Sequence, residues 1–200
     1  MGLRETKVAR TRAQIVDVAV NLFLEKGYDG TTMEEIAEQA EVGTTTLYRY
    51  FPSKDLILLD PFTREDPVAD TVRSRPADEP IDIVLGHAVL ATFAYLEHDQ
   101  PRINAIRTLI DESSAPRARL WDVLARNLAE LERAIAERTG APVDSVSVRM
   151  TARVTQLTIE LAADTWRSSE GTRRLPEIAR TIMAALKSDG VPFPAVPPSA

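Results

Sequence analysis

The stretch TTMEEIAEQAEVGTTTLYRYFPSK, residues 31–54, contains the signals of two short helices joined by a tight turn. Thr32 followed by Glu35 matches a capping box, in which each side chain accepts a hydrogen bond from a backbone N–H at the start of a helix. The helical pattern then breaks in the tripeptide that ends in Gly43, and we expect this glycine to adopt the backbone angles of the tight turn. The second helix must end before Pro52, because a proline ring disfavours helical geometry at the preceding residue. This order of signals predicts a helix-turn-helix unit.

The second helix of this stretch has an apolar side and a polar side. Leu47 and Phe51 are four residues apart, so they share the side that we expect to pack inward. The other side offers hydroxyl groups and the guanidinium of Arg49, which are groups that contact phosphates and base edges. We expect Arg49 to read a base, and we expect Thr32 and Lys54 to hold phosphates at helix N-termini. The predicted DNA-binding residues are Thr32, Thr44, Thr45, Thr46, Tyr48, Arg49, Tyr50 and Lys54.

The charge of the chain limits how it could bind DNA. Its net charge is −6 with a pI of about 5.1, and residues 1–55 hold seven Lys or Arg against nine Asp or Glu. Because phosphate neutralisation sets affinity and salt dependence, we expect modest, strongly salt-sensitive binding with little affinity for random DNA. Basic residues gather in the first twelve positions, which predicts a DNA-binding arm, with a solvated tail as the alternative. These residues are Arg4, Lys7, Arg10 and Arg12.

The segment LFLEKGYDGTTMEEIAEQAEVGTTTLYRYFPSKDLI, residues 22–57, closely resembles the N-terminal domain of the TetR family of bacterial transcriptional regulators. The elements GY, TTM, EIA, LY, YF and SK occur at the family's spacing, and the resemblance covers about residues 11–57. Two positions differ from the family pattern: Gly43 stands where serine is frequent as a helix cap, and Thr45 stands where glycine is frequent. We interpret both as differences in capping and in operator preference.

The rest of the chain also has helical patterns, which predicts an all-α fold of about nine helices. Before the helix-turn-helix unit, a helix is expected over residues 11–26, with Gly27 at its end. After Ser53 a further helix is expected, kinked or ended early by Pro61. The inward residues of the helix over 11–26 should be Ile15, Ala19, Leu22 and Phe23.

The second half of the sequence shows no strand alternation, and helices fit it at about 81–98, 102–113, 117–138, 143–168 and 172–187. The helix over 81–98 is apolar on nearly every side, so we expect it to be buried. The predicted domains are a helix-turn-helix DNA-binding domain over residues 1–60, a linker over 61–80, a ligand-binding and dimerisation domain over 81–188, and a Pro-rich tail over 189–200.

The helix over 143–168 has two apolar stripes about 160° apart, which suggests that it touches two bodies. One body would be the core of its own domain, and the other a second subunit; a central helix of a monomeric bundle is the alternative. We expect a homodimer through this helix and the one over 172–187, in a four-helix interface. The sequence leaves open which stripe faces the second subunit. The stripes are Met150, Val154, Leu157 and Leu161, and Val148, Ala152, Ile159, Ala162 and Trp166, with Ile178, Ile182 and Leu186 on the following helix.

Resemblance to the TetR family implies a pocket for a small-molecule effector among the helices of the second half. The segments RPADEP, residues 75–80, and RARLWDVLARNLAELERAIAERTG, residues 117–140, resemble the branch with acyl-CoA-like ligand-binding domains, typified by the mycofactocin-cluster regulators. That resemblance implies a long acyl thioester, acyl-CoA, as the effector. Core packing or a solvated face is the alternative for each candidate. The candidate ligand-binding residues are Phe93, Leu96, Ile106, Ile110, Trp121, Leu124, Arg153, Gln156, Leu157 and Glu160.

Other functional classes find little support in the sequence. The chain has no cysteine, and neither of its two histidines, His87 and His98, has a partner at the spacing of a metal site. It has no nucleophile elbow, phosphate loop or apolar run of membrane-spanning length. We therefore expect a cytoplasmic, homodimeric, ligand-responsive repressor of transcription without a cofactor, a metal or catalytic activity. An activator, or a small-molecule sensor or carrier on the same fold, is the alternative.

Overall fold

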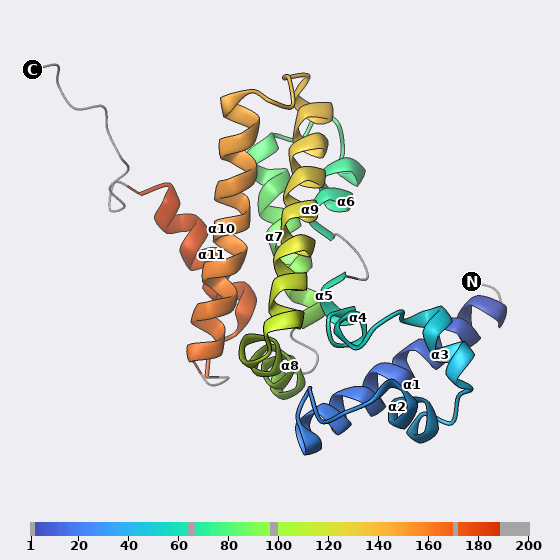
Figure 1. Cartoon of the computed structure of the whole chain (residues 1–200). Coiled ribbons are helices and arrows are strands. Elements are labelled where there is room, and N and C mark those ends of the chain that lie inside the picture. Colours follow the sequence, from blue (N-terminus) through green and yellow to red (C-terminus); the bar gives the residue numbers. More distant parts are fainter. Residues whose placement is uncertain (1–2, 64–66, 97–99, 170–171, 189–200) are drawn as a thin grey trace, which may run out of the picture. The chain divides into compact units, whose positions relative to one another are not determined.

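A computed structural model describes residues 3–63, 67–96, 100–169 and 172–188 of the chain. The fold is all-α, as predicted, and these residues contain no strand. None of their helices is both long and apolar enough to cross a membrane. Figure 1 shows the helices, which are α1 (Leu3–Lys26), α2 (Met33–Gln39), α3 (Thr44–Tyr50), α4 (Lys54–Leu58), α5 (Asp60–Thr63), α6 (Pro67–Ser74), α7 (Ile81–Leu96), α8 (Gln100–Glu112), α9 (Ser114–Thr139), α10 (Val146–Ser168) and α11 (Leu175–Leu186).

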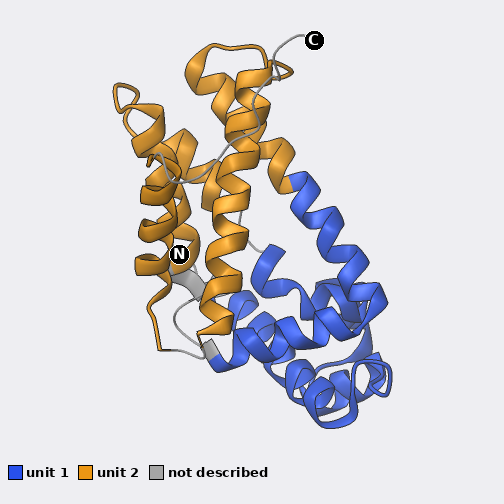
Figure 2. Cartoon of the chain, turned by 90° about the vertical axis from the view of Figure 1, so that its left-hand side faces the viewer, with its two compact units in different colours: residues 1–66, 101–126 blue, residues 67–100, 127–200 orange. Residues whose placement is uncertain are grey.

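The chain forms two compact units (Figure 2). Unit 1 contains residues 1–66 and 101–126, and unit 2 contains residues 67–100 and 127–200. These limits differ from the predicted ones, because α8 and the first half of α9 belong to the unit that holds the helix-turn-helix. The reason is packing: Ile106, Ile110 and Leu120 are buried in the same apolar core as Phe23 and Phe51.

Helix α1 shows which features of this unit the sequence predicted. Ile15, Ala19, Leu22 and Phe23 are buried, as expected, and Gly27 ends the helix with a φ of +79°, a conformation that favours glycine. The helix begins at Leu3 and not at residue 11. No proline or glycine interrupts residues 3–26, so the basic arm continues the helix.

The range 61–80, expected as a linker, contains helical residues. Helix α5 includes Pro61, and α6 covers residues 67–74. Val68, Ala69 and Val72 are buried in the core of unit 2 because they recur on one side of α6. The expectation of a linker over the whole range is therefore wrong for α6, which is a structural element of unit 2.

The core of unit 2 is built from α6, α7, α9 and α10. Helix α7 buries Val84, Ala88, Val89 and Phe93, but Ile83 is about half exposed. The prediction that this helix is buried is therefore confirmed at these four residues and wrong at Ile83.

The two apolar stripes of helix α10 differ in exposure. Within unit 2 it buries Val148, Ala152, Ala162 and Trp166, whereas Met150, Leu157 and Leu161 are exposed by 55%, 56% and 48%. On α11, Ile178 is buried in the same unit, and Ile182 and Leu186 are only half-buried. The stripe that contains Met150 is thus the one available to another body.

Candidate nucleic-acid interface

Helix α2 begins with the predicted capping box. The Glu35 N–H donates to Thr32 Oγ1 over 3.1 Å, and the Thr32 N–H donates to the Glu35 carboxylate over 2.9 Å. Lys26 Nζ, from the last turn of α1, lies 3.0 Å from the same carboxylate. The backbone hydrogen bond from Thr32 and, next, the Lys26 ammonium hold the pKa of Glu35 below its ordinary value. The cap therefore fixes the start of α2 against the end of α1.

The turn between α2 and α3 is a Schellman motif. The Val42 N–H donates to the Ala37 carbonyl and the Glu41 N–H to the Glu38 carbonyl, each over 3.0 Å. Glu41 has a φ of +52°, so it occupies the left-handed position that glycine usually takes. Gly43 instead has extended angles, φ −65° and ψ 142°. The expectation that Gly43 makes the tight turn is therefore wrong, because the hydrogen-bond pattern places the left-handed residue two positions earlier.

Gly43 is the N-cap of α3, and it provides no side chain to cap the helix. Its carbonyl accepts hydrogen bonds from the N–H groups of Thr46 and Leu47, over 2.8 and 3.0 Å. Leu47 and Phe51 are buried at 0% and 1% exposure, so they fix which side of α3 faces the core, as predicted. The predicted contact residues Thr44, Thr45, Tyr48 and Arg49 are exposed on the other side, and Thr46 and Tyr50 are half-buried.

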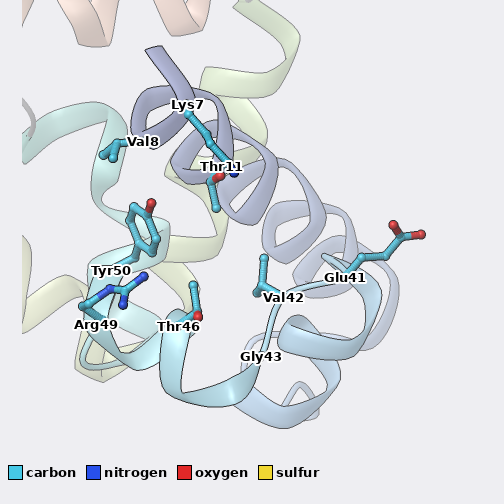
Figure 3. A pocket seen from close by; sticks show the side chains of 9 residues that line it. All are labelled: Lys7, Val8, Thr11, Glu41, Val42, Gly43, Thr46, Arg49 and Tyr50. Atoms are coloured by element: carbon cyan, nitrogen blue, oxygen red, sulfur yellow. The ribbon is translucent and has the colours of Figure 1, made fainter. Parts of the chain in front are cut away.

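An open hollow of about 440 Å³ lies between α1 and α3 (Figure 3). Arg49 Cζ stands 5.8 Å from the centre of the Tyr50 ring on its α3 side, and Lys7 lines the α1 side. The Glu41 carboxylate points away from the centre of the hollow. The lining residues are Lys7, Val8, Thr11, Glu41, Val42, Gly43, Thr46, Arg49 and Tyr50.

This hollow joins part of the basic arm to the polar side of α3, an arrangement that the sequence analysis missed. Thr11 follows Lys7 by one helical turn, so the helical period starting from Lys7 could have identified it. The arrangement requires α1 to be helical from Leu3, which the sequence analysis did not expect. Cations and hydroxyls around an open hollow are suited to a phosphate group.

Lys54 has partners inside unit 1. Its Nζ donates to the carbonyls of Tyr28 and Thr31, each over 2.7 Å, and stands 4.6 Å from the centre of the Tyr28 ring. Burial, and then the charges of Asp55 and Asp29, raise the pKa of the Tyr28 hydroxyl to about 12. The side chain of Lys54 therefore holds the turn between α1 and α2, whereas the sequence analysis expected it to hold a phosphate.

Arg12 also has partners inside the unit. Its Nε and Nη2 atoms lie 2.6 Å from Oδ1 of Asp60, and its guanidinium stacks over the Phe51 ring. Of the basic arm, Lys7 and Arg10 have exposed side chains, and the Arg4 side chain lies outside those that the structure describes.

The structure distributes the candidate ligand-binding residues over both units. Ile106 and Ile110 are buried in the core of unit 1, Leu124 packs against it, and Trp121 is 65% exposed. In unit 2, Phe93 is fully buried and Leu157 is exposed, and the side chain of Leu96 lies outside the described ones. This set is thus not brought together in one unit.

The three polar candidates on α10 have protein partners. Arg153 Nη1 lies 2.6 Å from the Glu132 carboxylate of α9, and Gln156 Nε2 donates to Glu160 over 2.7 Å. Arg153 is 47% exposed in its side chain. These contacts fit the alternative of a solvated helix face.

One of the two histidines named in the sequence analysis, His98, lies outside the described residues.

Comparison with known proteins identifies the N-terminal part. Residues 15–60 match the family described as "Bacterial regulatory proteins, tetR family". The HTH-type transcriptional regulator TcmR of Streptomyces glaucescens is 43% identical over 79 residues, which are 39% of this chain and 35% of TcmR. IcaR, a negative regulator of the biofilm operon icaADBC in Staphylococcus aureus, is 48% identical over 44 residues, 22% of this chain and 24% of IcaR. The chain thus spans about a third or less of the length of these curated relatives.

Solved structures share the fold over most of the chain. The regulator FadR from Bacillus subtilis, in complex with stearoyl-CoA, has a TM-score of 0.62 and 23% identity, covering 90% of this chain and 98% of its own. FadR from Bacillus halodurans, a fatty acid degradation regulator, has a TM-score of 0.63 and 21% identity, covering 88% and 98%. At this level of identity the likeness shows the fold alone.

Proposed function

From the match of residues 15–60 to the tetR family of bacterial regulatory proteins, we propose that the chain is a ligand-responsive, DNA-binding transcriptional regulator. In this proposal it is a homodimeric repressor that a small hydrophobic or acyl-type effector releases from a palindromic operator. The supporting observation is the exposed polar side of α3, which is held by two buried anchors, Leu47 and Phe51, and borders the hollow lined by Lys7 and Arg49.

Recognition would follow from the geometry of α3. A recognition helix of this kind lies in the major groove, and the two-fold axis of a dimer sets half-sites about 34–36 Å apart or a multiple of that distance. Arg49 would read guanine through a bidentate contact, which contributes about 1–3 kcal/mol of discrimination. Thr44, Thr45 and Tyr48 would contact phosphates or bases, because their side chains are exposed on the same helix.

The test is a selection of genomic fragments by the purified protein at moderate salt, repeated with Arg49→Ala. We expect the protein to enrich one or a few palindromic sites and the variant to lose that preference. Arg173→Ala is the matched control, since it removes the same charge from an exposed position of unit 2. If Arg49→Ala kept the sequence preference of the wild type, Arg49 would not read a base. If the wild type enriched no fragment, the proposed regulator function would be excluded.

The exposed stripe of α10 supports the dimer. Met150, Leu157 and Leu161 repeat at helical spacing and are about half exposed, and a contiguous apolar face of this kind marks an interaction surface. We expect Leu157→Glu to convert the dimer to a monomer in sedimentation equilibrium, because the carboxylate would be buried in the interface without a partner. Thr108→Glu, on an exposed position of α8 in unit 1, controls for added charge. A Leu157→Glu protein that remains dimeric would place the interface elsewhere.

An acyl-type effector is proposed for the C-terminal part of the chain, residues 81–188. Its support is the resemblance of residues 75–80 and 117–140 to acyl-CoA-binding regulators, together with a FadR of the same fold that was solved with stearoyl-CoA. A coupling of about 1–3 kcal/mol would weaken operator binding roughly 5- to 150-fold, provided that the effector binds the two conformers unequally. Calorimetric titration with acyl-CoAs of increasing chain length tests this, and no heat with any of them would exclude the class.

Two alternatives give different outcomes in the same measurements. An activator would also enrich a palindromic site, but reporter expression from that site would rise when the protein is present. A sensor or carrier would bind an effector and enrich no fragment. The polar side of α3 favours a DNA-binding protein over a carrier.

A further inference from the structure

Arg12 lies at the meeting point of three helices in unit 1. It belongs to α1, its guanidinium stands 4.3 Å from the centre of the Phe51 ring at the end of α3, and it pairs with Asp60 at the start of α5. Both Nε and Nη2 lie 2.6 Å from the same Asp60 oxygen. One side chain thus touches the C-cap residue of the recognition helix α3 and the first residue of α5.

The pair is buried on the Asp60 side. The Asp60 side chain is 7% exposed and that of Arg12 is 30% exposed. A carboxylate with so little water needs a charged partner, because a buried unpaired charge is strongly destabilising. The planar guanidinium can both pair with the carboxylate and stack on the ring, which an ammonium cannot do in the same geometry. These contacts therefore specify an arginine at this position.

Through Phe51, the Arg12–Asp60 contact can affect the C-terminal end of α3. Phe51 is the C-cap of the recognition helix, its N–H donates to the Leu47 carbonyl over 2.8 Å, and only 1% of it is exposed. A displacement of Asp60 would move the guanidinium, and the guanidinium could not move without changing its stacking on Phe51. Asp60 lies six residues before the end of the first segment of unit 1, which is Asp66.

We propose that Arg12 is a positioning residue for DNA recognition, which couples the start of α5 to the C-terminal end of α3 through Asp60 and Phe51. The proposal rests on the DNA-binding function proposed above and adds a regulatory contact to it. Arg12 was predicted to belong to the DNA-binding arm. In the proposal it acts inside the protein, while the exposed Lys7 and Arg10 act on DNA.

The test separates positioning from mere stability. The double variant Arg12→Met with Asp60→Leu replaces the pair by apolar side chains, a change that is often neutral or stabilising for a buried pair. We expect it to melt no lower than the wild type. We also expect faster amide hydrogen exchange in residues 48–51 without DNA and operator affinity about tenfold lower. Arg10→Ala is the matched control, and it should leave that exchange unchanged while reducing the salt dependence of DNA binding.

Wild-type exchange and wild-type operator affinity in the double variant would overturn the proposal, because the pair would then serve stability alone. If the double variant does not fold, Arg12→Lys tests the proposal instead, since lysine keeps the positive charge but has no planar group to stack on the Phe51 ring. Exchange in residues 48–51 that matches the wild type in Arg12→Lys would also overturn it. A wild-type protein that enriches no DNA site would instead sink the proposed function, and the exchange comparison would still decide whether Arg12 positions α3.

Discussion

Glu41 occupies a backbone conformation that suits glycine, so Glu41→Gly should stabilise unit 1. Its φ of +52° places it in the left-handed region, which is unfavourable for an L-residue by roughly 1–2 kcal/mol. Glycine does not have this unfavourable energy in the left-handed region. The unfolded chain is more flexible with glycine, however, which reduces the gain in stability by about 0.5–1 kcal/mol. The net expectation is a free energy of unfolding that rises by about 0.5–1 kcal/mol, equivalent to a melting temperature about 1–4 °C higher.

The matched variant is Glu41→Ala, which removes the same carboxylate and keeps the Cβ atom. Because the Glu41 side chain is exposed, Glu41→Ala should unfold close to the wild type, and the difference between the two variants isolates the backbone conformation. Urea unfolding followed by circular dichroism measures both. Equal stability of the alanine and glycine variants would refute the reasoning, since strain at the left-handed position would then contribute nothing.

Three further predictions concern stability. Lys54→Met should lower the free energy of unfolding by about 2–3 kcal/mol, because the carbonyls of Tyr28 and Thr31 lose a charged donor; unchanged stability in urea unfolding would contradict the role of Lys54 in holding the turn between α1 and α2. Gly30→Ser should lower it by about 2 kcal/mol or more, since a Cβ would lie 2.4 Å from a carbonyl oxygen of α1. Gly43→Ser, where the nearest atom is 3.9 Å away, should raise it by roughly 0.3 kcal/mol, and equal losses at both glycines would refute the steric argument. The pKa of Glu35 is lower in the folded protein than in the unfolded chain, so its ionised carboxylate stabilises the fold above the unfolded pKa and this stabilisation is lost as pH falls. The difference in free energy of unfolding between wild type and Glu35→Gln should therefore become smaller below about pH 4 in acid titrations. A difference that stays constant with pH would contradict this prediction.

The features that the sequence predicted are those encoded by local spacing. The capping box of Thr32 and Glu35 and the inward pair of Leu47 and Phe51 depend on residues three or four apart, and the structure confirms both. The sequence predicted the left-handed conformation at Gly43, because glycine adopts it most easily. The Schellman hydrogen bonds instead require that conformation at Glu41. Hydrogen-bond geometry here overrides residue preference.

Features that depend on distant partners could not be predicted from spacing. Ile106 and Ile110 are buried in one core with residues of α1 and α3, and no pattern within 102–113 indicates that core. The same limit applies to Arg12, whose partner Asp60 lies 48 residues away. A basic residue near the N-terminus has the same sequence signature whether it binds DNA or an internal carboxylate.

The number of cations that face DNA, and not partners inside the protein, determines the salt dependence of operator binding. With Arg12 and Lys54 held inside unit 1, three described cations of the basic arm and α3 have exposed side chains in each subunit: Lys7, Arg10 and Arg49. A dimer would then neutralise about six phosphates, and the slope of log K against log salt should be about −5. If Arg12 and Lys54 also contacted phosphates, the slope would be about −9, and Arg4 would add equally to both values.

Operator binding at several salt concentrations distinguishes these two values. Lys7→Ala should make the slope of the dimer less steep by about two, whereas the double variant Arg12→Met with Asp60→Leu should lower affinity and leave the slope unchanged. The double variant is decisive, because an arginine that pairs with Asp60 releases no counterion when DNA binds. A slope near −9 that becomes less steep in the double variant would place Arg12 on DNA. The Asp60 pair would then have to open when the operator binds, and the recognition helix would lose the contact that is proposed to orient it.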